Sequence, residues 1–262
     1  MPDLLKEERQ RLILETIQKQ GRATVADLSR QFSVSAITVR RDLHELAGHG
    51  LIHRAHGGAV LAVPLTPEPP VVRRMVERAE HKKRIGRAAA ALISDGESVF
   101  IGSGSTNVYL ARCLLERQNL TVDTNALNVA AELATAAGVT VVVLGGMMRA
   151  SELSLIGHIT EQAIREVRFD KAIIGIPAIH VEAGLTNDFL PEVMTDRAII
   201  DAAPALIVVA DHSKFGRVAS AYLAPVERVD TLVTDDQADA AILDRIRALG
   251  VRVIIAGYRA VR

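Results

Sequence analysis

The chain has 262 residues, of which 49% are hydrophobic and 24% charged, the composition of an ordinary globular protein. That composition excludes intrinsic disorder and collagen-like sequence, and a single cysteine, Cys113, excludes an intramolecular disulfide and a cysteine-based zinc site. An aromatic content of 3% without tryptophan argues against a stacking platform for single-stranded nucleic acid. No apolar run approaches the roughly 18 residues of a transmembrane helix, so we expect no membrane partner and a cytoplasmic location.

The net charge of zero conceals two unlike halves. Residues 1–87 contain 16 basic and 10 acidic side chains, whereas residues 88–262 contain 15 and 21. Four of the nine prolines fall within residues 64–70, and each lacks an N–H and holds the preceding residue in an extended conformation. We therefore predict an N-terminal domain over 1–62, a proline-rich linker and connecting helix over 63–94, and a larger domain over 95–262.

The first 60 residues predict three helices and a β-wing. Apolar residues recur at helical spacing over 9–20, a second helix begins after the capping residue Thr24, and Ser35 caps a third. Two short extended arms then flank a Gly-Gly turn within residues 50–60. In a helix-turn-helix of this layout, the third helix enters the major groove of DNA.

The third predicted helix has two different faces. Val39, Leu43 and Leu46 form its apolar stripe. At about 100° per residue, Ile37, Arg41 and His44 lie nearly opposite this stripe, and Thr38 and Arg40 lie on the flanks.

The remainder of the chain predicts an α/β domain. Short β-branched runs alternate with helical stretches, and most of the runs are continuously apolar. Such strands are buried on both faces of a mainly parallel sheet. The predicted strands cover residues 98–101, 120–122, 139–144, 171–174, 205–210, 231–234 and 251–256.

A glycine- and hydroxyl-rich segment follows the first of these strands. Its backbone N–H groups and three hydroxyls, at the start of a predicted helix, suit an anionic oxygen group such as phosphate. It is not a dinucleotide fingerprint, because Asn107 stands where the third glycine would be, and no Walker lysine is present. Polar residues after other strands are expected to meet it at the carboxyl ends of the sheet. The candidate binding residues are Gly102, Ser103, Gly104, Ser105, Thr106, Asn107, Asn125, Asp211 and Lys214.

The N-terminal motif resembles the DNA-binding signature of the DeoR family of bacterial transcriptional regulators. The matching strings are Val34-Ser35, Thr38-Val39-Arg40-Arg41-Asp42-Leu43 and Gly50-Leu51-Ile52-His53-Arg54-Ala55-His56-Gly57-Gly58-Ala59. The resemblance implies DNA contacts from the third helix and the wing; we assign Thr38 and Ile37 to base edges and Arg41 to phosphate. The candidate DNA-binding residues are Ser35, Ile37, Thr38, Arg40, Arg41, His44, Arg54 and His56.

The larger part resembles the DeoR-type effector domain, whose fold is similar to that of ribose-5-phosphate isomerase and glucosamine-6-phosphate deaminase. This resemblance implies that residues 102–107 hold the phosphate of an effector, and that Asn125, Asp211 and Lys214 line its sugar end. Asp211 as a turn cap and Lys214 as a surface lysine remain alternatives. The chain departs from the family at Asp123, where an apolar residue is common, and at Asp196, where a lysine is frequent.

The expected function is repression of a sugar or polyol catabolism operon. The partners would be double-stranded operator DNA and a phosphorylated sugar or polyol, in a homodimer or homotetramer. No cofactor is expected, and the clustered histidines 44, 49, 53 and 56 lack the spacing of a metal site. Two alternatives remain open: a transcriptional activator that responds to the same ligand, and an isomerase-type enzyme that uses Asp170 or Glu182 as a base.

Overall fold

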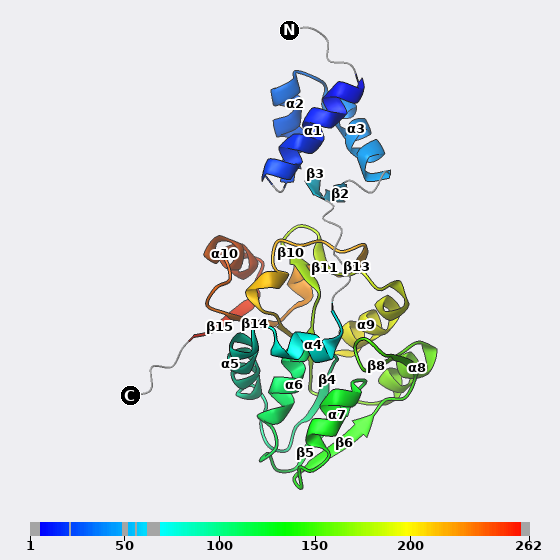
Figure 1. Cartoon of the computed structure of the whole chain (residues 1–262), viewed down its shortest axis with the longest axis vertical. Coiled ribbons are helices and arrows are strands. Elements are labelled where there is room, and N and C mark those ends of the chain that lie inside the picture. The colour runs from blue at the N-terminus through cyan, green and yellow to red at the C-terminus, as the bar shows by residue number, and fades with distance from the viewer. Residues whose placement is uncertain (1–5, 21, 49–51, 56, 62–68, 258–262) are drawn as a thin grey trace. The chain divides into compact units, whose positions relative to one another are not determined.

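The chain folds into two units, residues 1–66 and residues 67–262 (Figure 1). The structure, a computed structural model, describes residues 6–20, 22–48, 52–55, 57–61 and 69–257. None of the helices in these ranges is long and apolar enough to cross a membrane.

The first unit is a winged helix-turn-helix. Its elements are α1 (Lys6–Gln20), β1 (Arg22–Thr24), α2 (Val25–Phe32), α3 (Ala36–Gly48), β2 (Ile52–Ala55) and β3 (Gly58–Leu61). The predicted stripe of α3 is buried with Ile13 and Leu28 in one core. The two predicted arms are confirmed as the antiparallel pair β2 and β3. Strand β1, which pairs with β3, was not predicted because three residues are too short to show a period.

Local side-chain chemistry fixes the starts of α2 and α3. The hydroxyl of Thr24 accepts the N–H of Asp27 at 3.1 Å, and that of Ser35 accepts the N–H of Thr38 at 3.1 Å, so both predicted caps are confirmed. The wing turn requires glycine twice. Gly57 has a φ of +78°, and a Cβ on Gly58 would lie 2.3 Å from the carbonyl oxygen of Ala23.

The second unit is built on a seven-stranded sheet of order β15-β14-β12-β9-β4-β5-β6, in which every pair is parallel. Each strand corresponds to one of the seven predicted runs, so the α/β fold class is confirmed. The strands are β4 (Ser98–Ile101), β5 (Leu120–Thr124), β6 (Val139–Val143), β9 (Lys171–Gly175), β12 (Leu206–Val209), β14 (Thr231–Asp235) and β15 (Arg252–Ala256).

Helices and small sheets complete the second unit. The helices are α4 (Val71–Val76), α5 (Ala79–Ala90), α6 (Ser105–Arg112), α7 (Leu127–Leu133), α8 (His158–Glu166), α9 (Leu190–Ala202) and α10 (Ala240–Ala248), with the 3₁₀ turns η1 (His212–Lys214) and η2 (Val226–Arg228). A hairpin pairs β7 (Met147–Arg149) with β8 (Ser154–Ile156), and an antiparallel sheet joins β10 (Ala178–His180), β11 (Gly184–Asn187) and β13 (Ala221–Ala224).

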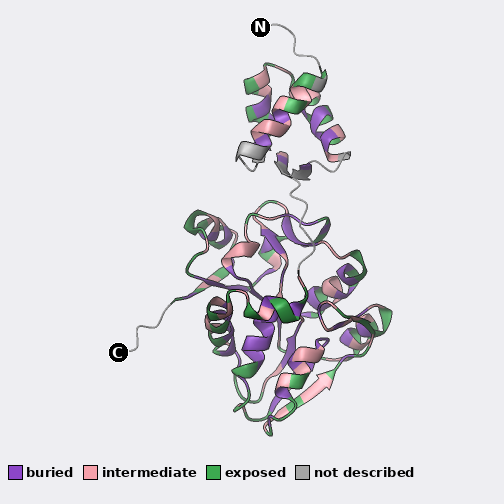
Figure 2. Cartoon of the chain, in the orientation of Figure 1, coloured by how far each residue is buried: buried purple, intermediate pink, exposed green. Residues whose placement is uncertain are grey.

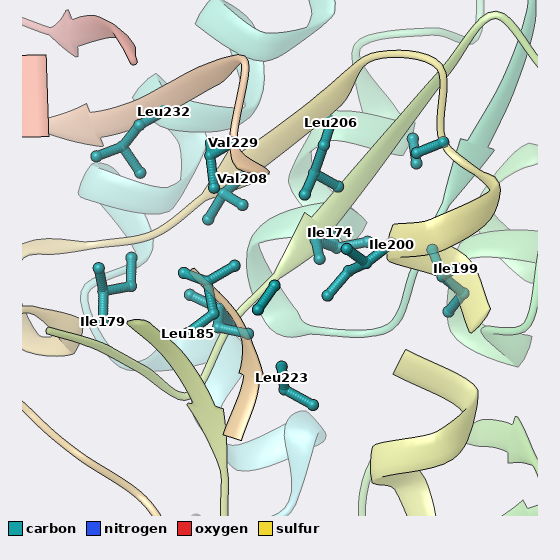
Figure 3. Packing of buried hydrophobic residues seen from close by; sticks show 14 of the residues in the cluster. Ile174, Ile179, Leu185, Ile199, Ile200, Leu206, Val208, Leu223, Val229 and Leu232 are labelled. Carbon is teal, nitrogen blue, oxygen red and sulfur yellow. The ribbon is translucent and has the colours of Figure 1, made fainter. Parts of the chain in front are cut away.

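Neighbouring residues of the central strands are buried in two different cores. Val99 and Ile101 pack with α5, α6 and α7, whereas Phe100 packs in the cluster that includes residues of α8, α9 and α10. Figure 2 shows these strands as buried, and Figure 3 shows part of the second cluster, where Ile174 lies near Ile200 and Val208 near Val229. Burial on both faces is the physical reason for the continuously apolar runs.

The segment that the sequence assigns to a connecting helix forms two helices of the second unit. Arg78, with a φ of +50°, separates α4 from α5. Ile85 and Ala89 of α5 are fully buried in the core beneath α6, so this part of the predicted segment 63–94 is packed against the sheet domain. Gly86 permits the close approach, because a Cβ there would lie 2.7 Å from the backbone nitrogen of Leu110.

Candidate nucleic-acid interface and candidate ligand crevice

Helix α3 presents the predicted contact residues on its exposed face. Ile37 is 76% exposed, Arg40, Arg41 and His44 are exposed, and Thr38 is half-buried. The exposed isoleucine among cations is an apolar group of the kind that contacts thymine methyls in the major groove. The side chain of Arg54 is not described, and His56 lies outside the described residues.

Asp42 lies on the opposite side of α3 and anchors the helix to α1. Its carboxylate accepts two bonds from Arg9, Nε at 2.6 Å from Oδ2 and Nη2 at 3.2 Å from Oδ1. Only 2% of the Asp42 side chain is exposed. In the run Arg40-Arg41-Asp42, the arginines therefore face outward while the aspartate is buried. Sequence reasoning missed Arg9 because it lies 33 positions away.

Arg41 is only weakly held within the protein. Its Nε lies 3.7 Å from Glu45 Oε1, and 79% of its side chain is exposed. An exposed pair of this geometry contributes about 0–1 kcal/mol, so exchanging it for a phosphate costs little.

The carboxyl edge of the central sheet, where β5, β4, β9, β12 and β14 end, collects the predicted ligand residues. Gly102–Gly104 follow β4, Asn125 follows β5, and Asp211 lies two residues beyond β12. Ser105, Thr106 and Asn107 form the first turn of α6 and not a loop. The amide of Asn107 donates to the carbonyls of Gly102 at 2.9 Å and Ser103 at 3.1 Å, which fixes the turn before the helix.

Two lysines face the carboxylate of Asp211. Lys82 of α5 is buried, and its ammonium group donates to the carbonyls of Arg74 and Glu77, both at 2.6 Å. Burial lowers the pKa of Lys82 to about 8, although the charge of Asp211 opposes that shift. Sequence reasoning missed Lys82 because it stands in a mixed charge run typical of a solvated helix.

Asp211 has a structural role as well. Its side chain accepts the N–H of Ser213 at 3.0 Å and caps η1, as the alternative to ligand binding had proposed. Burial alone would raise its pKa, but the bonds from Ser213 and the charges of Lys214 and Lys82 lower the pKa below its ordinary value. Lys214 lies half-buried beside it.

Two buried amide oxygens lie among the predicted ligand residues. Asn125 is tied to the protein through its Nδ2, which donates to the carbonyl of Leu155 at 3.0 Å. Among the described residues, the Oδ1 atoms of Asn125 and Asn107 have no hydrogen-bond partner. Because buried acceptors are normally satisfied, each such atom calls for a donor such as a hydroxyl or water.

The two acidic departures from the family pattern lie in different surroundings. Asp123 is buried in β5, where burial raises its pKa while the side chain of Ser98, at the amino end of β4, lowers it. Asp196 of α9 accepts from the amide of Asn187 at 2.7 Å, and burial together with the charge of Glu192 raises its pKa well above the ordinary value. Only Asp196 belongs to a larger polar network.

That network links the β7–β8 hairpin to α9 and α4. Arg149 pairs with Glu192, whose other oxygen accepts from Ser154 at 3.1 Å, and Arg74 pairs with Glu152. The guanidinium of Arg149 also stacks 4.0 Å from the ring centre of Phe189. These long-range pairs gave no signal in the sequence.

The two residues weighed as catalytic bases lie elsewhere. Asp170 accepts the N–H of Ser98 at 2.9 Å, at the amino end of β4 and so at the opposite edge of the sheet. Glu182 is in the turn between β10 and β11 and pairs with Arg245.

A winged helix-turn-helix combined with a parallel α/β sheet unit defines a class of two-domain DNA-reading protein with a separate sensor. Comparison with known proteins agrees: residues 9–64 match the DeoR-like helix-turn-helix domain, and residues 77–236 match the DeoR C terminal sensor domain. The chain belongs to the DeoR family.

Named relatives extend over nearly the whole chain. A putative aga operon transcriptional repressor of Escherichia coli O157:H7 is 33% identical over 95% of this chain and 94% of its own length. The glycerol-3-phosphate regulon repressor of E. coli K12 is 38% identical over 85% of this chain and 88% of its own. A solved ribose 5-phosphate isomerase A from Methanocaldococcus jannaschii matches 53% of this chain and 55% of its own, with 16% identity and a TM-score of 0.40.

Proposed function

We propose that this protein is a transcriptional repressor of sugar or polyol catabolism genes that a phosphorylated sugar or polyol releases from operator DNA. The observation that carries the proposal is the exposed Ile37-Arg40-Arg41 face of α3, held outward by the buried Asp42–Arg9 pair. The names of the relatives, repressors of the aga operon and of the glycerol-3-phosphate regulon, support the direction of regulation.

On DNA, α3 reads the major groove. Thr38 and Ile37 contact base edges, the latter through a thymine methyl, whereas Arg40 and Arg41 neutralise phosphates. These roles predict that the two kinds of side chain affect DNA binding differently when they are removed. Arg41→Ala weakens binding to all sequences and reduces the salt slope by about 1, whereas Thr38→Ala reduces the preference for the operator over other DNA.

The test is fluorescence anisotropy with the DNA fragment upstream of the gene, titrated at several salt concentrations. Arg11→Ala is the matched control, because Arg11 is an exposed cation of α1 in an ion pair with Glu15. The control keeps the wild-type affinity and salt slope. An Arg41 variant with an unchanged salt slope, or a wild-type protein that retains no upstream fragment, would contradict the proposal.

In the sensor unit, the phosphate of the effector binds the first turn of α6, where Ser105 and Thr106 supply hydroxyls. Lys82 and Lys214 supply the cationic charge, and hydroxyls of the effector donate to the orphan Oδ1 atoms of Asn107 and Asn125. The site therefore takes an anion at one end and a polyhydroxylated chain at the other.

A thermal-shift screen of phosphorylated sugars and polyols identifies the effector. A ligand at 100 times its Kd adds about 2.7 kcal/mol to the free energy of unfolding, a shift that is readily measured. Lys214→Met and Ser105→Ala should each reduce the stabilisation by the ligand. Lys83→Met should not reduce it, because Lys83 is an exposed lysine of α5 that pairs with Glu80. Stabilisation that survives both changes would mean that the site lies elsewhere.

Release from DNA follows from linkage between the two sites. An effector that lowers operator affinity by a given factor must itself bind the DNA complex more weakly by the same factor. Two-fold symmetric half-sites require a dimer or tetramer, which light scattering measures. A reporter in a deletion strain tests the sign: expression rises if the protein represses and falls if it activates.

A further inference from the structure

Three side chains from distant parts of the sequence meet at the carboxyl edge of the central sheet. His81 is in the first turn of α5, His212 opens η1, and Asp235 ends β14. Within the described ranges, this is the one group of three histidine, cysteine or acidic residues with a ligand atom from each within 4.8 Å of the others. Neither the proposed DNA contacts nor the proposed effector contacts use it.

The two imidazoles converge on one carboxylate oxygen. Nδ1 of His212 lies 3.0 Å from Oδ1 of Asp235, and Nδ1 of His81 lies 3.5 Å from the same atom. The two rings meet edge to face with their centres 5.3 Å apart. In a tetrahedral site with metal bonds of about 2.0–2.2 Å, ligand atoms stand about 3.3–3.6 Å apart, so these two N–O separations need little adjustment.

The carboxylate is preorganised and the imidazoles are accessible. Asp235 is completely buried, and backbone N–H groups of His212 and Gln237 donate to its two oxygens, each at 2.9 Å. The side chains of His81 and His212 are 19% and 25% exposed. An ion can therefore reach the site from solvent, and water can complete its coordination.

We propose that His81, His212 and Asp235 bind a divalent transition-metal ion of the zinc class. Two imidazoles and a carboxylate suit zinc, cobalt or nickel rather than magnesium or calcium, which prefer oxygen ligands alone. The ion would displace the bond that Arg84 Nη2 donates to His81 Nδ1 at 3.0 Å. Arg84 keeps a carboxylate partner in that event, because Asp236 already accepts from both of its Nη atoms, at 2.9 and 3.0 Å.

The test titrates the tag-free full-length protein with Co²⁺, followed by visible absorption, and then displaces the cobalt with Zn²⁺. We expect one ion per chain. His81→Gln and His212→Gln should each raise the Kd for Zn²⁺ at least tenfold, while circular dichroism shows the wild-type helix content. His158→Gln, an exposed histidine of α8, and Cys113→Ser, the single exposed thiol, should bind as the wild type does.

Two results would overturn the proposal: no saturable binding of either ion, or binding that both histidine variants retain. The first would identify the cluster as a metal-free His–Asp hydrogen-bond network, and the second would place the ion elsewhere. Because the titration uses neither DNA nor a sugar phosphate, its outcome is independent of the proposed regulatory function.

Discussion

Replacing Asp42 by alanine should strongly destabilise the DNA-binding unit, residues 1–66, while leaving the stability of the sensor unit, residues 67–262, unchanged. The change removes the carboxylate that receives Nε and Nη2 of Arg9, a residue whose side chain is only 12% exposed. Breaking one side of a buried pair costs about 3–5 kcal/mol. A unit of this size has a total stability of roughly 3–10 kcal/mol, so the loss is comparable with the whole.

The composition of the chain allows the two units to be followed separately. All three tyrosines, Tyr109, Tyr222 and Tyr258, belong to residues 67–262, and there is no tryptophan. Tyrosine fluorescence therefore reports on the sensor unit alone, whereas circular dichroism reports on both. At about 4–8 °C for each kcal/mol in a domain of this length, Asp42→Ala should lower the first dichroism transition by at least about 12 °C.

Glu15→Ala is the matched control, because it removes a carboxylate from an exposed pair with Arg11 on the same helix. It should cost about 0.3–0.5 kcal/mol and barely move the transition. The reasoning would be refuted if both variants shifted the transition equally, or if the fluorescence transition moved with Asp42→Ala. Operator affinity should fall with the dichroism transition, since α3 loses its anchor.

Three further predictions concern the sensor unit. Gly86→Ala should cost about 1–3 kcal/mol in urea unfolding because its Cβ would meet the backbone of α6 at 2.7 Å, whereas Gly257→Ala, with open space around it, should stay within about 0.5 kcal/mol. Lys82, with a pKa of about 8, loses its charge as the pH rises from 7 to 9, so calorimetry should show weaker binding of the phosphorylated effector at pH 9. Lys82→Met should make binding weak at both pH values. A wild-type affinity that does not change with pH would exclude Lys82 from the site. The raised pKa of Asp196 means that the native state holds this proton more tightly than the unfolded state, so the stability that this group contributes falls as the pH rises from about 4 through the raised pKa. Asp196→Asn should therefore raise the Tm at pH 7 and make the Tm depend less on pH. A variant whose Tm depends on pH as the wild type's does would contradict the raised pKa.

The strands and the recognition helix could be predicted because their signals are local. Phe100 and its neighbours Val99 and Ile101 face two cores, so these three residues of β4 are all apolar, and all four residues of β12 are apolar as well. The face of α3 follows from helical geometry alone once Leu43 is assigned to the core. In both cases a period of a few residues carries the information.

The missing parts of the site depend on pairs that no local period encodes. Lys82 stands in a charged run that looks like a solvated helix, yet it is buried and its ammonium group donates to the carbonyls of Arg74 and Glu77. Asn107 was predicted as a ligand residue, and its amide donates to the carbonyls of its own turn. The sequence indicates which hydrogen bonds and charges these side chains can offer, but not which neighbouring groups they contact.

The proposed effector site and the proposed metal site share two backbone segments. Adjacent residues of α5, His81 and Lys82, interact with adjacent residues at the start of η1, His212 and Asp211. The imidazoles meet over Asp235, while the lysine and the aspartate attract one another. We therefore expect a ligand at one proposed site to change the affinity of the other, and by linkage any such effect is equal in the two directions.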